Sequence, residues 1–233
     1  MPSYLVVLSG GMDSTTLLYM LKDVGEVQAV SFDYGQRHRI ELECAKNIAR
    51  IADVKHRVID ITNVGKAIAG HSALLAGDKN IEVPHGHYAA DNMAITVVPN
   101  RNMIMSSIAA GVAVAEGLDC IALAVHAGDH AVYPDCRPEF VRALDAAIRA
   151  ATDDAVGVVA PFIQKSKAEI VAIGERFHVP WAETQTCYEG TRIACGRCGT
   201  CVERIEAFDL NGVEDPLPYR EGGKEYARDI VRE

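Results

Sequence analysis

The sequence lacks long apolar runs, clusters of basic residues and the cysteine density of a disulfide-rich protein. No stretch approaches the roughly 18 consecutive apolar residues that a membrane-spanning helix needs, so no membrane association is expected. Lysine and arginine never form a run longer than a pair, and 23 basic residues stand against 32 acidic ones, a net charge of −9. Because proteins that bind along nucleic acids neutralise phosphates with basic surfaces, we expect a small-molecule substrate and no nucleic acid.

The chain has enough residues for one substantial core, with 233 in total and 49% hydrophobic. The first apolar run begins close to Met1 without a cationic leader, and we expect a cytoplasmic protein. Seven cysteines are too few for a disulfide scaffold, and four of them lie within residues 187–201. This crowding favours metal binding over disulfides.

Apolar runs typical of buried parallel strands alternate with segments of helical period. Strands are predicted at residues 4–8, 27–32, 56–61, 120–125 and 156–161. Helices are predicted at residues 14–22, 36–51, 101–116 and 138–151, with one more opened by a capping box at Ser166 and Glu169. The pattern predicts an α/β fold of Rossmann-like type, with a five-stranded parallel sheet and helices on both faces.

The chain is expected to divide unevenly within one folding unit. Residues 1–180 are predicted to form an α/β domain, and residues 181–233 a small C-terminal subdomain and tail that contains the four crowded cysteines. Residues 70–99 are too long for a silent connection and are interpreted as an active-site or interface loop. The tail after Asp209 contains two prolines and a glycine pair, and we expect it to be loosely ordered.

A glycine pair lies between the first predicted strand and the first predicted helix, in the string Ser-Gly-Gly-Met-Asp-Ser of residues 9–14. There, backbone amides and a helix N-terminus can converge on a phosphate. The string is neither a Walker loop nor a dinucleotide fingerprint, which require other glycine spacings. A bare glycine pair is more often an ordinary turn, in which Asp13 or Ser14 would cap the helix.

The complete string, however, resembles the pyrophosphate loop of the adenine nucleotide alpha hydrolases, enzymes that adenylate a carbonyl or carboxyl oxygen. The resemblance implies that the ATP phosphates are held by Ser9, Gly10, Gly11, Asp13, Ser14 and Thr15.

The four crowded cysteines have the spacing C-x7-C-x2-C-x2-C, with glycines between them that permit tight turns; they are Cys187, Cys195, Cys198 and Cys201. Four thiolates suit a closed, tetrahedral and therefore structural zinc site. An iron–sulfur cluster is the alternative, since C-x2-C-x2-C also occurs in ferredoxins.

Polar and aromatic residues follow the second predicted strand, where ligands bind in an open parallel sheet. They can face adenine or substrate and are Phe32, Tyr34, Gln36 and Arg37. The next residue, His38, is interpreted as a solvated loop residue or a polar group at a helix start. The histidines at 71, 85, 87, 126 and 130 lack the spacing of a helical metal pair and are expected in loop or core polar roles.

Four further residues are candidates for catalysis. Arg101 lies in the first turn of a predicted helix, where a cation is unfavourable unless an anion binds, so it is a candidate for phosphate or carboxylate. Asp135 and Arg137 follow the fourth strand and can contact substrate, whereas the neighbouring Cys136 is interpreted as a packed or substrate-lining thiol. Lys167, beside the cap at Ser166, is either a phosphate contact or a surface lysine.

Several motifs together resemble the 7-cyano-7-deazaguanine synthase family, across about residues 4–208. Besides the glycine loop and the cysteines, they are F-D-Y-G-Q-R-H at 32–38, V-P-x-R-N at 98–102, Y-P-D-C-R-x-E-F at 133–140 and T-C-Y-x-G at 186–190. Two segments depart from the family pattern: Asn100 stands where some members have glycine, and residues 126–129 read His-Ala-Gly-Asp instead of an acidic Cys-Glu-Thr-Asp.

The resemblance implies ATP-dependent conversion of 7-carboxy-7-deazaguanine and ammonium into the nitrile, a step of queuosine and related deazapurine biosynthesis. ATP, Mg²⁺ and Zn²⁺ are the implied cofactors, and a homodimer is implied by the family alone. Adenylation of the acid and then of the amide would consume two ATP, with AMP and pyrophosphate favoured as products over ADP.

Three other functions remain open on the sequence. A tRNA-modifying pyrophosphate-loop ligase or sulfur-transfer enzyme would use the same loop, although the acidic composition argues against it. A nucleotide-binding regulator without catalysis is possible because a fold does not fix a function. A relative that attaches the deazaguanine to a protein or DNA is the third.

Overall fold

The computed structural model describes residues 1–76 and 81–232. Its centre is a parallel sheet with the strand order β3-β2-β1-β4-β5. The strands are β1 (Ser3–Val7), β2 (Glu26–Asp33), β3 (Lys55–Asp60), β4 (Cys120–Ala122) and β5 (Gly157–Val159). The predicted five-stranded parallel sheet is therefore confirmed.

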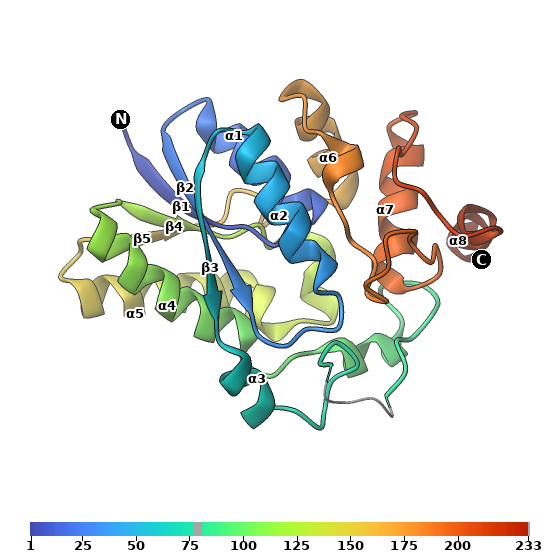
Figure 1. The fold of residues 1–233 in the computed structure, drawn as a ribbon, viewed down its shortest axis with the longest axis horizontal. Coiled ribbons are helices and arrows are strands. Elements are labelled where there is room, and N and C mark those ends of the chain that lie inside the picture. Colours follow the sequence, from blue (N-terminus) through green and yellow to red (C-terminus); the bar gives the residue numbers. More distant parts are fainter. Residues whose placement is uncertain (77–80, 233) are drawn as a thin grey trace.

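Helices cover both faces of the sheet, as predicted (Figure 1). One layer contains α1 (Met12–Lys22), α2 (Ile40–Ile51) and α6 (Lys167–Arg176), and the other contains α4 (Arg101–Glu116) and α5 (Pro138–Thr152). Side chains alternate between the faces because successive residues of a strand point in opposite directions. Leu5 packs in the core beneath α4 and α5, whereas its neighbour Val6 packs beneath α1, α2 and α6.

The strand order places a switch point at β1. The chain runs from β1 outward through β2 to β3, then returns to the other side of β1 to form β4. Connections on either side of the switch point therefore diverge beyond the carboxyl ends of the strands, where open α/β sheets bind ligands.

Several boundaries differ from those predicted. Helix α2 begins at Ile40 rather than at residue 36, α1 begins earlier than predicted, at Met12, and β4 and β5 have only three residues each. The capping box is confirmed: the Glu169 amide donates to Ser166 Oγ at 3.2 Å, and the Ser166 amide donates to Glu169 Oε2 at 2.9 Å. The short helix α3 (Thr62–Ala67) follows β3 and was not predicted.

The long segment at 70–99 contains a 3₁₀ helix at Asp91–Thr96 (η1) and packs against the carboxyl edge of the sheet. The backbone amide of Ala73 donates to the carbonyl of Ile95 at 2.8 Å, which closes the segment on itself. Residues 77–80 of this predicted loop lie outside the described part of the chain.

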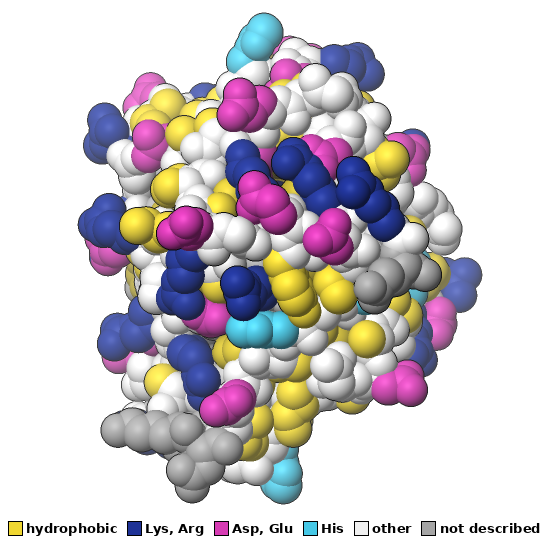
Figure 2. Space-filling view, turned by 90° about the vertical axis from the view of Figure 1, so that its right-hand side faces the viewer, with side chains coloured by type: hydrophobic (Ala, Val, Ile, Leu, Met, Phe, Trp, Pro, Cys, Tyr) yellow, Lys and Arg dark blue, Asp and Glu magenta, His cyan; other side chains and the backbone are white. Residues whose placement is uncertain are grey.

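The C-terminal region adds two helices, α7 (Gly199–Leu210) and α8 (Gly223–Arg232), beside α6 (Figure 1). The expectation of a loosely ordered tail after Asp209 is wrong, since Asp215 and Leu217 are each 5% exposed. An ion pair from Asp215 to Arg204 holds the tail on α7. Figure 2 shows acidic and basic side chains intermingled on this side, where Arg228 pairs with Asp209. None of the described helices is both long and apolar enough to cross a membrane.

Candidate active site

A cavity opens at the carboxyl edge of the sheet, between the two helix layers and α7. Residues from the glycine loop, the end of β2, the start of α4 and α7 all reach it. Its lining includes most of the predicted ATP-contacting residues, namely Ser9, Gly11, Asp13, Ser14, Phe32, Tyr34 and Gln36. Two of the predicted catalytic cations, Arg101 and Lys167, line the same cavity.

Glycine is required at position 10 of the loop for two separate reasons. Gly10 has a φ of 92°, in the region that glycine adopts readily. A Cβ atom there would lie 2.2 Å from the carbonyl oxygen of Glu41, so the loop can approach α2 only without a side chain. Gly10 thereby sets the loop against α2.

Side-chain hydroxyls fix the rest of the loop. The amides of Ser9 and Gly11 donate to Ser14 Oγ and Ser9 Oγ, respectively, each at 3.1 Å. Thr15 does not line the cavity; its Oγ1 donates to the carbonyl of Gly11 at 2.7 Å. Gly11 is the N-cap of α1, and no side chain caps the helix there. The amides at the start of α1 are thus available to an anion.

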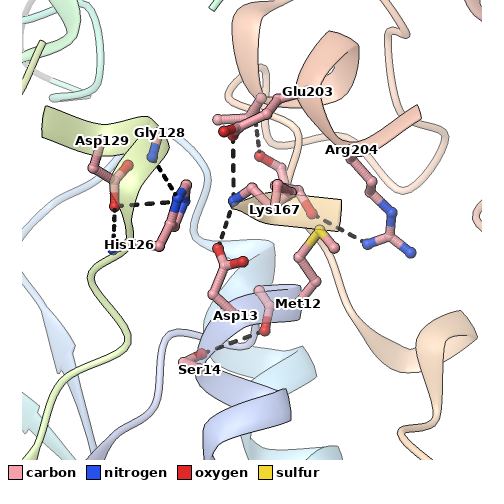
Figure 3. A network of polar contacts seen from close by, with 12 residues as sticks. Met12, Asp13, Ser14, His126, Gly128, Asp129, Lys167, Glu203 and Arg204 are labelled. Carbon is pink, nitrogen blue, oxygen red and sulfur yellow. Dashed lines mark hydrogen bonds and ion pairs between the residues drawn. The ribbon is translucent and has the colours of Figure 1, made fainter. Parts of the chain in front are cut away.

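Lys167 joins three elements at one side of the cavity (Figure 3). Its Nζ atom lies 2.7 Å from Asp13 Oδ2 on α1 and 3.3 Å from Glu203 Oε2 on α7. Burial lowers the pKa of Lys167, but the two carboxylates outweigh burial and hold it above its ordinary value. Burial raises the pKa of Asp13, and Lys167 again outweighs it, so that pKa is lowered. Lys167 and Asp13 therefore form a charged pair, whereas burial raises the pKa of Glu203 despite the opposing charge of Lys167.

Residues 126–129, the segment that differs from the family pattern, form a tight turn beside this network (Figure 3). His126, 1% exposed, accepts a hydrogen bond at Nδ1 from the Gly128 amide at 3.1 Å, and its Nε2 lies 3.5 Å from Asp129 Oδ2. A Cβ on Gly128 would lie 2.5 Å from Glu203 Oε1. The glycine in this chain therefore admits Glu203 to the cavity.

Arg101, the first residue of α4, lines the same cavity. Burial lowers the pKa of Arg101, but Tyr34, Cys136 and Asp135 outweigh it and raise the pKa, so the guanidinium stays charged. Asn100, just before it, has a φ of 56°, a left-handed conformation that asparagine tolerates better than most residues. Glycine at this position in related chains is explained by the same backbone.

Besides Gly10 and Thr15, three predicted catalytic or ATP-contacting residues lie outside the lining of this cavity. Asp135 accepts the Asn102 amide at Oδ2 at 3.0 Å and so stabilises the start of α4. Arg137 Nε donates to the carbonyl of His130 at 3.0 Å, and Arg37 Nη2 donates to the carbonyl of Ile81 at 2.8 Å. In the structure these three residues hold loops around the cavity.

His38 is not the solvated residue that the sequence suggested, because it is 3% exposed and lines the cavity. Its ring lies 5.8 Å from that of Tyr188. The Tyr188 hydroxyl is 3.0 Å from that of Tyr133, which is 2.7 Å from Thr96 Oγ1. This row of hydroxyls ties η1 to the cavity wall.

The four clustered cysteines are buried and unpaired as disulfides, and their sulfurs all lie within 4.8 Å of one another. A tetrahedral zinc site with bonds of about 2.3 Å would set the sulfurs about 3.8 Å apart. Cys195 Sγ and Cys201 Sγ are separated by 3.9 Å. Backbone amides of Cys195, Arg197 and Cys198 donate to cluster sulfurs at 3.3 Å, as expected around thiolates. The donor set fits zinc.

Comparison with known proteins gives the family. The model of the family described as "Queuosine biosynthesis protein QueC" matches residues 3–212. The chain belongs to the QueC family. The 7-cyano-7-deazaguanine synthase of Marinobacter nauticus is 50% identical over 218 residues, covering 93% of this chain and 97% of the relative. That of Brucella anthropi is 51% identical over 220 residues, covering 93% of each chain.

Among solved structures, the fold is similar to that of NMN synthetase from Francisella tularensis. The TM-score is 0.51 with 12% identity, covering 98% of this chain and 83% of that one. This similarity shows the fold alone. The family and its synthase relatives make the chain an enzyme with an α/β fold.

Sequence reasoning missed several lining residues, chiefly Glu41, Tyr188 and Glu203. Glu203 carried no distinguishing signal, since Arg204, Glu206 and Asp209 are charged residues of the same helix. Tyr188 lay within a family motif but was given no role. Glu41 lies three residues beyond the F-D-Y-G-Q-R-H motif, and nothing in the local pattern separates it from a solvated helix residue.

Proposed function

We propose that the chain is an ATP-dependent carbon–nitrogen ligase that converts 7-carboxy-7-deazaguanine and ammonia into 7-cyano-7-deazaguanine. One observation carries the proposal beyond family membership. The same cavity holds the free amides of the glycine loop and the charged guanidinium of Arg101. That arrangement suits a nucleotide triphosphate and a carboxylate bound against one another.

The chemistry explains the need for ATP. A carboxylate is a poor electrophile because its leaving group would be oxide, whereas an adenylated carboxylate releases AMP. Ammonia then displaces AMP and forms the amide. A second adenylation, on the amide oxygen, permits loss of AMP again and leaves the nitrile, so two ATP are consumed for each product.

The residues of the chain would position the reactants and neutralise charge, with no covalent intermediate on the protein. The loop amides and Lys167 would bind the phosphates, and Arg101 would orient the carboxylate. Cys136 is a poor candidate for a nucleophile, because burial raises the pKa of its thiol far above the ordinary value.

Mg²⁺ fits one position in this cavity. Asp13 Oδ1 is buried without a hydrogen-bond partner among the described residues, and carboxylate oxygens are the ligands that Mg²⁺ prefers. Bound there, Mg²⁺ would supply neutralisation of the phosphate charge.

Zinc at the four cysteines would be structural, holding the start of α7, whose N-cap is Cys198. We expect about one zinc per chain by elemental analysis, because a closed four-thiolate site binds one tetrahedral ion. Cys198→Ser should lose the metal and lower the unfolding temperature, whereas Cys120→Ser, in β4, should keep it. Bound iron with visible absorbance would contradict the zinc assignment.

Mass spectrometry of the reaction of purified protein with ATP, Mg²⁺, ammonium and the carboxylic acid tests the function. The expected result is nitrile without a glutamine-hydrolysing partner.

A further inference from the structure

We propose that Glu41 is the ammonium-binding group of this cavity and that His38 is the neutral residue that positions its carboxylate. The inference rests on the proposed function, which requires ammonia as a second substrate. At neutral pH that substrate arrives as a cation, so the site needs an acceptor for a positive charge and for one proton.

Glu41 lies at the place where such a group is needed. It is in the first turn of α2, and its backbone packs directly against Gly10 of the phosphate loop. Its side chain is 14% exposed and lines the cavity that also contains Arg101. A carboxylate bound by Arg101 and activated at the loop would therefore present its carbon near Glu41.

The other acidic side chains lining the cavity already have partners. Asp13 and Glu203 share Lys167, and Asp129 Oδ2 accepts the backbone amide of His126 at 3.3 Å. Among the described residues, Glu41 has no lysine or arginine nitrogen within 4.0 Å. Its nearest partner is His38 Nε2, at 3.6 Å from Oε2, beyond ordinary hydrogen-bond length. Glu41 is thus the lining carboxylate that is open to an incoming cation.

His38 is held so that it supports this carboxylate without neutralising it. Its side chain is 4% exposed and packs against Tyr188, while its backbone is approached so closely by Gly190 that a Cβ there would lie 2.7 Å from His38 Cα. Burial, with Arg101 and Arg37 nearby, lowers the pKa of His38 to about 3. The imidazole is neutral at pH 7, and a hydrogen on Nε2 would point toward the Glu41 carboxylate.

The surroundings of Glu41, chiefly its burial, favour proton transfer from ammonium. Burial raises the pKa of Glu41 well above its ordinary value; Arg101 opposes this, and Cys187 and Asp13 reinforce it. A carboxylate with a raised pKa is a stronger proton acceptor.

The proposed step balances as follows. Ammonium gives one proton to the Glu41 carboxylate and becomes ammonia. The ammonia lone pair forms the C–N bond to the adenylated carbon, the C–O bond to AMP breaks, and AMP leaves with the electron pair. The second proton leaves the new nitrogen to solvent, which gives the amide.

The test compares Glu41→Gln with Glu43→Gln, a control on the same helix whose side chain is 69% exposed. Two reactions are followed: ATP–pyrophosphate exchange driven by the acid without ammonium, and amide formation with ammonium varied. For Glu41→Gln we expect exchange to be kept and the ammonium KM to rise about tenfold or more, the size of a lost charge-assisted hydrogen bond. Glu43→Gln should match the unmodified protein in both reactions.

Hydroxylamine, which is neutral at pH 7, provides a second readout because it needs no deprotonation. Glu41→Gln should form the hydroxamate at close to the unmodified rate. An unchanged ammonium KM, loss of exchange, or equal loss with hydroxylamine would each overturn the assignment. Should Glu41→Gln fold poorly, Glu41→Asp is expected to raise the ammonium KM in the same way. If the unmodified protein shows no exchange with this acid, the proposed function fails, which is a separate result.

Discussion

Lys167→Met should lower acid-dependent pyrophosphate release by about a hundredfold or more, the usual cost of removing a preorganised charged donor from an active site. The change removes the cation that lies between Asp13 and Glu203, 2.7 and 3.3 Å away, and leaves two carboxylates without a cation beside the phosphate site. Their repulsion would add to the loss of a phosphate contact. Pyrophosphate release in a coupled assay is the measurement.

Lys165→Met is the matched control, because Lys165 lies two residues away and is 43% exposed, paired with Glu169 at 2.8 Å. It should keep activity within about twofold, as surface ion pairs contribute little. Equal activity of the two variants would refute the role given to Lys167.

Asp215→Ala should reduce the free energy of unfolding by about 3–5 kcal/mol, the cost of leaving a buried charge without its partner. Arg204 is 0% exposed, and its Nε and Nη2 donate to the two Asp215 oxygens at 2.8 Å each. Arg204 Nη1 also donates to Thr184 Oγ1 at 2.8 Å, so this residue joins the tail, α7 and the segment after α6. Urea unfolding is the measurement.

Asp209→Ala is the control for that experiment. Asp209 pairs with Arg228 at the surface, where both side chains are over 40% exposed, and its loss should cost less than about 1 kcal/mol. A similar cost for both variants would contradict the account of the ordered tail.

The ion pair between Asp215 and Arg204 also predicts how the free energy of unfolding depends on pH in acid. Burial raises the pKa of Asp215, but hydrogen bonds and charge from Arg204 outweigh it and hold the pKa below its ordinary value. Because the folded pKa is the lower one, this stabilisation is present above the unfolded pKa and is lost as pH falls through the folded value. Asp215→Asn should therefore flatten the loss of stability below about pH 4.

The sheet was predictable because apolar strands and helical segments alternate along the chain, and each pattern is visible within a short stretch of sequence. Helix boundaries were not predictable where side-chain hydrogen bonds fix the local backbone against the hydrophobic periodicity. Helix α2 begins late because Gln36 is held in a turn: its Oε1 accepts the Tyr34 amide at 2.9 Å, and its Nε2 donates to the Phe32 carbonyl at 3.1 Å. In the sequence alone, this turn at Gln36 could not be distinguished from the first turn of the helix.

In the candidate site, too, the local features were predictable and the long-range contacts were not. The glycine loop and the cysteine cluster are local strings, so their spacing carried the prediction. Lys167 and Asp13 meet across 154 positions, and only the fold brings them together. The tail was misjudged because one buried ion pair, Arg204 with Asp215, outweighs a composition typical of loose segments.

The central claim is tested most directly by product analysis. Purified protein would be incubated with ATP, Mg²⁺, ammonium and 7-carboxy-7-deazaguanine, and products followed by mass spectrometry with nucleotides quantified in parallel. The account predicts the nitrile, with two AMP released for each molecule formed. If protein that is folded and binds ATP forms neither the amide nor the nitrile, that result would contradict the account.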